Sequence, residues 1–156
     1  MTDSALRELY QEVILDHSRH PRHYGTLEGA SHKAEGYNPL CGDRVTVYLK
    51  LGEDNRVADI KFEGKGCAIS QASASMMTLK LKGKTRSEAA DLARSFKDLV
   101  TSEASNETKG LGDLQLLQGV RKFPQRVKCA MLAWRAIEQA LSETSGELTV
   151  TTEADA

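Results

Sequence analysis

Pro39-Leu40-Cys41-Gly42-Asp43-Arg44-Val45-Thr46-Val47-Tyr48-Leu49-Lys50-Leu51 is a stretch in which a thiol and a carboxylate lead directly into alternating hydrophobic and polar residues. The alternation is typical of a strand with one buried face. Continued backwards, it places Cys41 and Asp43 on the same face as the valines. Gly42 has no Cβ, so the backbone can bend there and a metal or a second chain can come close. The stretch therefore predicts a core strand that begins beside a soft thiolate and a hard carboxylate.

The segments on either side of this strand predict a small sheet. Residues 52–56 have the composition of a turn, and residues 57–63 predict a second, weaker strand. Residues 44–63 are therefore expected to form an antiparallel hairpin. Upstream, residues 25–38 are rich in Gly and Ser and are expected to be irregular.

Hydrophobic residues at helical spacing predict the remaining elements, with helices expected over 4–16, 68–82, 86–100, 114–120 and 129–141. Residues 101–112 are polar and predict a loop. Strands followed by helices predict an α+β fold, a small antiparallel β-sheet with α-helices packed against it. We expect a single domain over residues 1–145 and a frayed, polar C-terminal tail over residues 146–156.

Length and composition narrow the class of protein. The 156 residues suffice for one domain with one core, and 40% hydrophobic with 28% charged residues is ordinary for a globular protein. A net charge of −1 gives no basic field for nucleic acid or an anionic membrane. No transmembrane run or signal-peptide pattern is present, so we expect the cytoplasm, where cysteines stay reduced. An odd number of cysteines favours metal or redox chemistry over a disulfide framework.

The cysteines lie at predicted element ends, which can meet in space. Cys67 follows the second strand at the start of a helix, where the helix dipole favours a thiolate. Cys129 lies near the start of the last helix, on its buried face. With Cys41 and Asp43 they supply three thiolates and one carboxylate, a set that suits Zn²⁺. An alternative stays open, because no Cys-x-x-Cys pair is present and free cysteines are often inert core residues.

Other groups near these positions have simpler interpretations as well. Arg126 and Lys128 lie beside Cys129 and are placed to compensate the negative charge of such a site, although lone cations at helix ends are usually solvated. Trp134 lies opposite or at the edge of the last helix's hydrophobic stripe and is interpreted as a packing residue. Because no acidic or cysteine-rich motif surrounds the histidines, we interpret all four as surface or capping groups rather than ligands: His17, His20, His23 and His32.

Beyond the cysteine spacing, the sequence resembles the SufU branch of the IscU/NifU-like iron–sulfur cluster assembly proteins, over nearly the whole chain to about residue 142. The motifs that carry the resemblance are Leu9-Tyr10 with Val13-Ile14-Leu15-Asp16-His17 and Pro21-Arg22, Asn38-Pro39-Leu40-Cys41-Gly42-Asp43, Phe62 to Gly66 with Cys67-Ala68-Ile69-Ser70-Gln71-Ala72-Ser73-Ala74-Ser75, and Arg126-Val127-Lys128-Cys129 with Leu132-Ala133-Trp134. The resemblance implies the same α+β fold.

The resemblance also implies a site and a partner. It implies one Zn²⁺ per chain bound by Cys41, Asp43, Cys67 and Cys129, with Arg126 beside the zinc. It implies a SufS-type cysteine desulfurase that passes persulfide sulfur to Cys41, with two chains binding each desulfurase dimer. It also implies downstream SUF assembly proteins as partners. The chain itself is expected to be monomeric.

Two departures separate the sequence from the IscU scaffolds that the family also contains. Lys128 stands where those chains have a histidine before the third cysteine, and residues 123–128 replace their Leu-Pro-Pro-Val-Lys motif. Three functions follow as hypotheses: a zinc-dependent sulfurtransferase that relays persulfide sulfur, an iron–sulfur cluster scaffold, and an interaction protein with purely structural zinc. Thiolates suit both zinc and iron–sulfur clusters.

Overall fold

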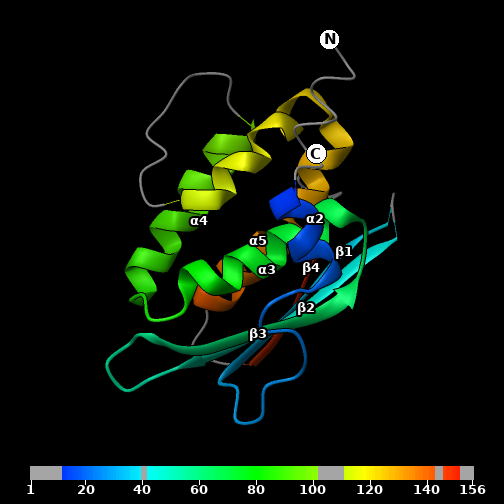
Figure 1. The fold of residues 1–156 in the computed structure, drawn as a ribbon. Helices are drawn as coiled ribbons and strands as arrows, with labels where there is room; N and C mark the ends of the chain where they lie inside the picture. Colours follow the sequence, from blue (N-terminus) through cyan, green and yellow to red (C-terminus); the bar gives the residue numbers. More distant parts are fainter. Residues whose placement is uncertain (1–11, 40–41, 102–110, 143–145, 152–156) are drawn as a thin grey trace.

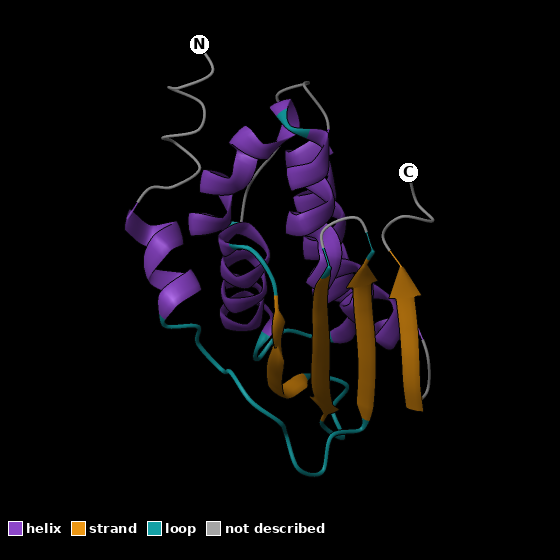
Figure 2. Ribbon diagram, turned by 90° about the vertical axis from the view of Figure 1, so that its right-hand side faces the viewer, coloured by secondary structure: helices purple, strands orange, loops and turns teal. Residues whose placement is uncertain are grey.

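The computed structural model describes residues 12–39, 42–101, 111–142 and 146–151, the last only as backbone. Along the chain the elements are α2 (Glu12–Arg19), β1 (His32–Asn38), β2 (Asp43–Leu51), β3 (Val57–Lys65), α3 (Ala68–Leu81), α4 (Arg86–Thr101), the 3₁₀ helix η1 (Gly112–Lys122), α5 (Pro124–Ser142) and β4 (Gly146–Thr151). The helices lie together on one side of a sheet (Figure 1, Figure 2). The predicted α+β class is confirmed.

The sheet has the strand order β3-β2-β1-β4. β2 pairs antiparallel with β1 and with β3, so the predicted hairpin over residues 44–63 is confirmed. Its turn is closed by Gly52, whose N–H donates to the carbonyl of Arg56 at 2.8 Å. The inward residues of β2, Val45, Val47 and Leu49, are buried as their alternation predicts.

β1 corrects the prediction that residues 25–38 are irregular. Residues 32–38 form a full strand that pairs with β2 from His32↔Leu49 to Asn38↔Asp43. Its inward positions do alternate, but they are His32, Ala34, Gly36 and Asn38, which give no hydrophobic signal. Gly36 is required by packing, since a Cβ there would lie 3.1 Å from Leu132. The helix layer therefore comes too close to β1 for large side chains.

β4 corrects the prediction of a frayed tail. Residues 146–151 pair in parallel with β1, from His32↔Gly146 to Tyr37↔Thr151. An edge strand offers a row of unpaired N–H and C=O groups, and the sequence Leu148-Thr149-Val150 has high strand propensity. The expected domain limit at residue 145 therefore falls just before a strand that belongs to the sheet.

α3 and α5 pack in the centre of the molecule and carry nearly half of the buried hydrophobic residues. Trp134 of α5 is fully buried and stacks on Phe96 at 4.7 Å between ring centroids. The packing role predicted for Trp134 is confirmed. The prediction that it lies opposite or at the edge of the hydrophobic stripe of this helix is wrong. Its indole N–H donates to Ser73 Oγ at 3.1 Å, and Ser73 donates to the carbonyl of Ala130 at 2.6 Å. This chain of hydrogen bonds ties α3 to α5.

The other predicted helices are present where they fall on described residues. The first is described as α2, and residues 4–11 of its predicted range lie outside the described residues, as do residues 102–110 of the predicted loop. The short helix predicted over 114–120 is the 3₁₀ helix η1. Among the described residues, no helix is long and apolar enough to cross a membrane.

Candidate metal centre

Asp43 is the first residue of β2 and points into the protein. It pairs with Asn38 at the end of the β1–β2 hairpin and is only 4% exposed. Its Oδ2 atom is buried and has no hydrogen-bond partner in the described part of the chain. A buried carboxylate oxygen without a partner is costly, so this position calls for a cation.

Cys67 is the N-cap of α3, directly after β3 ends. Its backbone is extended, with φ −72° and ψ 171°, and the N–H of Gln71 donates to its carbonyl at 3.1 Å. Its side chain does not cap the helix, so the sulfur is left for another ligand. The helix N-terminus favours a negative charge on that sulfur.

Cys129 lies in the second turn of α5 and is 1% exposed. The next residue, Ala130, accepts the hydrogen bond from Ser73 of α3. Because Cys67 begins α3, the link between Ser73 and Ala130 helps to hold the two cysteines at a fixed spacing.

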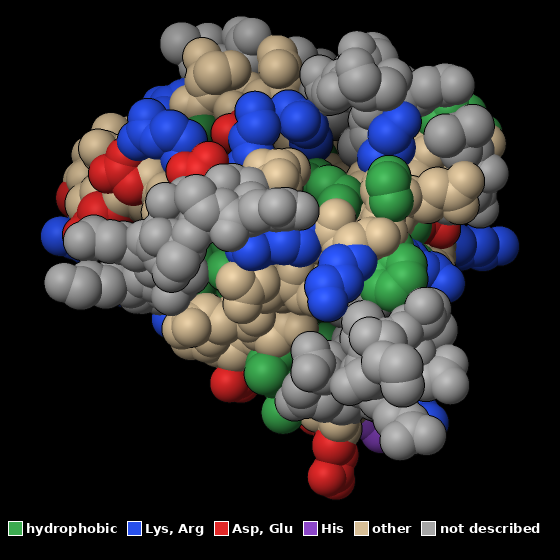
Figure 3. Space-filling view, turned by 90° about the horizontal axis from the view of Figure 1, so that it is seen from above, with side chains coloured by type: hydrophobic (Ala, Val, Ile, Leu, Met, Phe, Trp, Pro, Cys, Tyr) green, Lys and Arg blue, Asp and Glu red, His purple; other side chains and the backbone are tan. Residues whose placement is uncertain are grey.

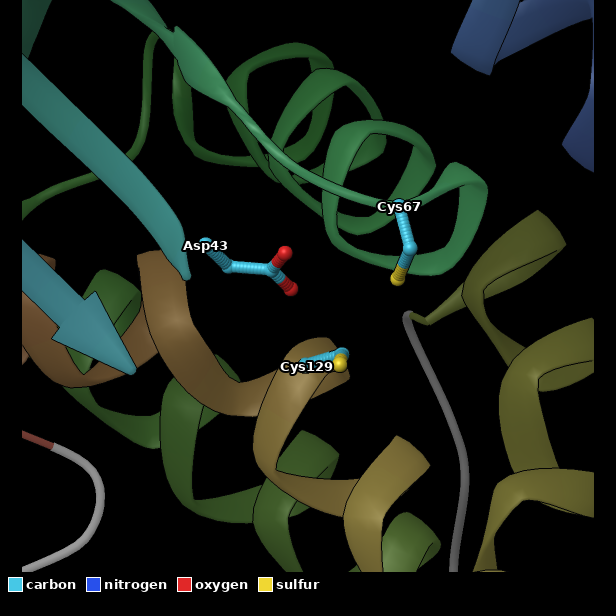
Figure 4. A group of neighbouring side chains, drawn as sticks. All are labelled: Asp43, Cys67 and Cys129. Carbon is cyan, nitrogen blue, oxygen red and sulfur yellow. The ribbon is translucent and has the colours of Figure 1, made fainter. Parts of the chain in front are cut away.

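The structure brings three of the four predicted ligands together. Ligand atoms of Asp43, Cys67 and Cys129 all lie within 4.8 Å of one another. Figure 4 shows the three side chains converging from the start of β2, the start of α3 and the first part of α5. Two sulfur atoms and one carboxylate are donors that Zn²⁺ takes in tetrahedral sites. With the unpartnered Oδ2 atom of Asp43, the donor set fits this metal.

The two thiols have different proton affinities. The Cys129 thiol donates a hydrogen bond that lowers the pKa of Cys67 to about 6, with help from the N–H groups of Ile69 and Ser70. The same hydrogen bond, together with burial and the nearby negative charges, raises the pKa of Cys129 far above its usual value. Cys67 therefore loses its proton more readily than Cys129, and a bound metal would displace the protons of both thiols.

Cys41 lies outside the described residues, but the residues that flank it in β1 and β2 are described. It falls between β1 and β2 in the sequence, and the last described pair of these strands is Asn38↔Asp43. Gly42 has φ 75°, a conformation that L side chains rarely adopt, and its N–H donates to the carbonyl of Asn38 at 2.8 Å. Along the sequence, Cys41 is two residues from Asp43, a member of the cluster.

Arg126 and Lys128 lie in the first turns of α5, before Cys129. Arg126 is one turn ahead of Cys129 and is half-buried, as is Lys128. Their position agrees with the expectation of cations near the site. A role for Arg126 in the chemistry remains a proposal.

Gly66 is a residue of the site that the sequence did not identify as one. A Cβ at this position would lie 3.1 Å from Cγ of Asp43 and would clash with Oγ of Ser70. Ser70 is held in place because it donates to the carbonyl of Cys67 at 3.1 Å. The signal available in the sequence was a glycine directly before a candidate ligand, with no indication of what it faces.

Replacing Gly66 with Ala is expected to lower zinc affinity about ten-fold or more, because a packed site resists an added methyl group by about 1–3 kcal/mol and the Asp43 carboxylate must move. The measurement is competition with a chromophoric chelator. In an Asp43→Ala background, where the carboxylate is absent, Gly66→Ala is expected to lower zinc affinity less than it does in the wild type. A full loss in that background would show that Ser70, and not Asp43, responds to the methyl group.

The four histidines lie outside the cluster that the described residues form. The surface interpretation is nevertheless wrong for two of them. His32 is 3% exposed, and its Nδ1 atom lies 2.8 Å from Oγ of Ser31. His17 is 6% exposed, and its Nδ1 atom lies 2.7 Å from Oγ of Ser75, which also accepts the N–H of Arg22. His17 therefore fastens α2 to α3.

Stability is expected to fall at mildly acidic pH through His17. Burial, and then the charge of Arg22, lowers its pKa below the ordinary 6.5, so the unfolded chain takes up this proton more readily. The free energy of unfolding should thus decrease as pH falls through 6.5 towards the lowered value. Thermal melts at a series of pH values measure this, with His17→Asn as the control that keeps an acceptor near Nδ1. An equal pH dependence in both proteins would contradict the prediction.

Comparison with known proteins assigns the fold and the cluster to a family. Residues 9–148 match the family described as NifU-like N terminal domain. The chain is 45% identical to the zinc-dependent sulfurtransferase SufU of Bacillus subtilis, across 90% of this chain and 95% of the relative. It is 43% identical to the iron-sulfur cluster assembly scaffold protein IscU of Streptococcus pyogenes, across 93% and 90%. The chain belongs to the IscU/NifU family of iron–sulfur cluster assembly proteins.

Solved structures support the same assignment. The crystal structure of a putative iron-sulfur cluster assembly scaffold protein for the SUF system from Fervidobacterium islandicum matches with a TM-score of 0.80. That protein is 37% identical, and the match covers 85% of this chain and 96% of the other. The family and the fold that the sequence predicted are confirmed.

Proposed function

We propose that this chain is a zinc-dependent sulfurtransferase that accepts persulfide sulfur on Cys41 and relays it during iron–sulfur cluster assembly. The observation that carries the proposal is the convergence of Asp43, Cys67 and Cys129 within 4.8 Å, with a buried, unpartnered carboxylate oxygen. The donor is a cysteine desulfurase of the SufS type. Sulfur relay requires free thiols, which fits the reducing cytoplasm.

The candidate site residues would have two roles, holding the metal and accepting sulfur. Asp43, Cys67 and Cys129 come from a strand and two helices, and with Cys41 they would complete a four-ligand site. Bound zinc supplies a positive charge that keeps the thiolates deprotonated at neutral pH. Cys41, on its hairpin loop, is the thiolate that can leave such a site with the least change in the fold.

The transfer step is a thiolate attack on a persulfide. The Cys41 sulfur bonds to the outer sulfur of the desulfurase persulfide, and the bond between that sulfur and the desulfurase cysteine breaks. The desulfurase leaves as a thiolate that recovers a proton, and the transferred sulfur remains on Cys41. No electrons are gained or lost overall.

A cluster scaffold is the second candidate, since relatives with similar identity carry that name. Thiolate and carboxylate ligands also hold iron, and the family assembles iron–sulfur clusters. Lys128, in the place where IscU chains have histidine, favours the sulfurtransferase. Metal analysis of protein purified without oxygen separates the two, because a scaffold retains iron and sulfide where a sulfurtransferase retains one zinc.

Intact mass spectrometry after mixing with a desulfurase and cysteine tests the main proposal. We expect a mass gain of one sulfur atom, removed by reductant and located on Cys41 by peptide mapping. The surface seen from above mixes Lys and Arg side chains with small hydrophobic areas, which suits contact with a protein partner (Figure 3). A chain that stays unlabelled while the desulfurase turns over would overturn the sulfurtransferase function.

A further inference from the structure

The face of the sheet that points away from the helices carries an unusual row of side chains at the end where Asp43 lies. Tyr37 of β1, Arg44 of β2 and Lys65 of β3 are cross-strand neighbours, through the pairs Tyr37↔Arg44 and Arg44↔Lys65. Arg44 and Lys65 are exposed. Two cations directly opposite each other destabilise a sheet, so their pairing needs a compensating role.

Neither cation is neutralised by the described part of the chain. No carboxylate there forms an ion pair with Arg44 or Lys65, and the guanidinium of Arg44 lies instead 5.0 Å from the ring centre of Tyr37. Glu35 and Glu63 lie opposite Thr46 on the same face, and Glu63 accepts the hydroxyl of Tyr48 at 2.5 Å. The row therefore presents positive charge beside an aromatic ring.

The same residues surround a hollow of about 600 Å³, lined by Tyr24, Tyr37, Gly42, Arg44, Glu63 and Lys65 among others. Tyr24 is 48% exposed and is fixed by its hydroxyl, which donates to the carbonyl of Gly64 at 2.9 Å. Aromatic rings with two cations form a surface that suits an extended chain bearing carboxylates.

The hollow lies back to back with the metal cluster. Asp43 points inward and Arg44, its neighbour, points outward, because side chains alternate along β2. Gly42, which follows Cys41 and precedes Asp43 in the sequence, lines the hollow. A segment bound in the hollow would therefore touch the hairpin from which sulfur is accepted.

We propose that this hollow binds an acidic, extended segment of the sulfur-donating protein and so places the donor beside the β1–β2 hairpin. The inference rests on the proposed function for the identity of the partner. The occupant is a stretch of protein that bears several carboxylates. The reason is that the positive charge on this chain comes from two cross-strand neighbours, Arg44 and Lys65, rather than from a single group.

Two double variants of the zinc-loaded protein test the surface. Arg44→Gln with Lys65→Gln removes the pair, and Lys50→Gln with Lys61→Gln removes the same charge from the same face, farther from Asp43. With a SufS-type desulfurase, we expect the first variant to raise the KM for the desulfurase about ten-fold, with kcat and zinc content unchanged. The second should stay within about two-fold. Equal effects from both would overturn the proposal.

A hexaglutamate peptide tests the hollow without the desulfurase. Amide NMR signals of Gly42, Arg44 and Lys65 are expected to shift on peptide addition, and the Arg44→Gln/Lys65→Gln variant should lose these shifts. Equal shifts with free glutamate, at the same carboxylate concentration, would mean that the hollow binds small anions. That result would overturn the proposal that it binds an extended segment. The absence of any shift on peptide addition would also overturn the proposal. A wild-type chain that binds peptide but takes no sulfur refutes the proposed function and leaves the hollow supported.

Discussion

Replacing Cys41 with Ala is expected to leave no persulfide on this chain and to abolish its stimulation of a desulfurase, while the fold survives. Cys41 lies between Asn38 and Asp43 in the sequence, so the change leaves every described pair of β1 and β2 in place. The change removes the only thiol on that loop. Sulfur labelling should therefore fall to background, whereas circular dichroism and the sheet stay as in the wild type.

Cys67→Ala and Cys129→Ala are the matched controls for this experiment. Both residues join helix ends to the core, and Cys129 is almost fully buried. Either change should lose zinc and lower the melting temperature together, because a ligand and its packing are both removed. Wild-type sulfur uptake by Cys41→Ala, or a persulfide mapped to Cys67 or Cys129, would contradict Cys41 as the acceptor.

Removing zinc is expected to lower the melting temperature by about 10 °C. The candidate ligands that the structure describes come from β2, α3 and α5, elements that are separated in the chain, so we expect the native state to bind the metal far more tightly than the unfolded chain. Free zinc at about 1,000 times its dissociation constant adds about 4 kcal/mol, and each kcal/mol shifts the melting of a domain of this size by about 2–4 °C.

Calorimetry before and after chelation, with metal content measured on the same samples, checks the effect. Returning one equivalent of zinc should restore the transition, while Mg²⁺, which avoids thiolates, should not. An unchanged melting curve after complete removal would mean that the metal does not stabilise the fold. Asp43→Ala provides a graded comparison, since it removes one ligand and leaves both helix ends intact.

The strands with strong hydrophobic alternation were predictable, and those without it were not. β2 carries Val45, Val47 and Leu49 at every second position, so both the strand and its buried face followed from the pattern. β1 has the same burial alternation, but Gly36 and Ala34 fill the positions nearest the helices. Small residues are imposed there by the distance to α5, which no local pattern records. β4 likewise forms because the edge of β1 is available for pairing.

The candidate site divides in a similar way. Three of its members, Asp43, Cys67 and Cys129, were predictable because their residue types are metal ligands and their positions are element ends. Gly66 was not, because its role is to leave space for a carboxylate that lies far away in sequence. The burial of His17 was also unpredictable, since its partner Ser75 is on another helix.

The sequence by itself determined the class of fold, the family and the residues able to bind metal, because these depend on residue type and local periodicity. Only the tertiary structure decided that Asp43, Cys67 and Cys129 converge within 4.8 Å. It also decided that Arg44 and Lys65 stand side by side on the opposite face of the sheet. The physical reason is strand register, which fixes at once which side chains meet across the sheet and which face they occupy.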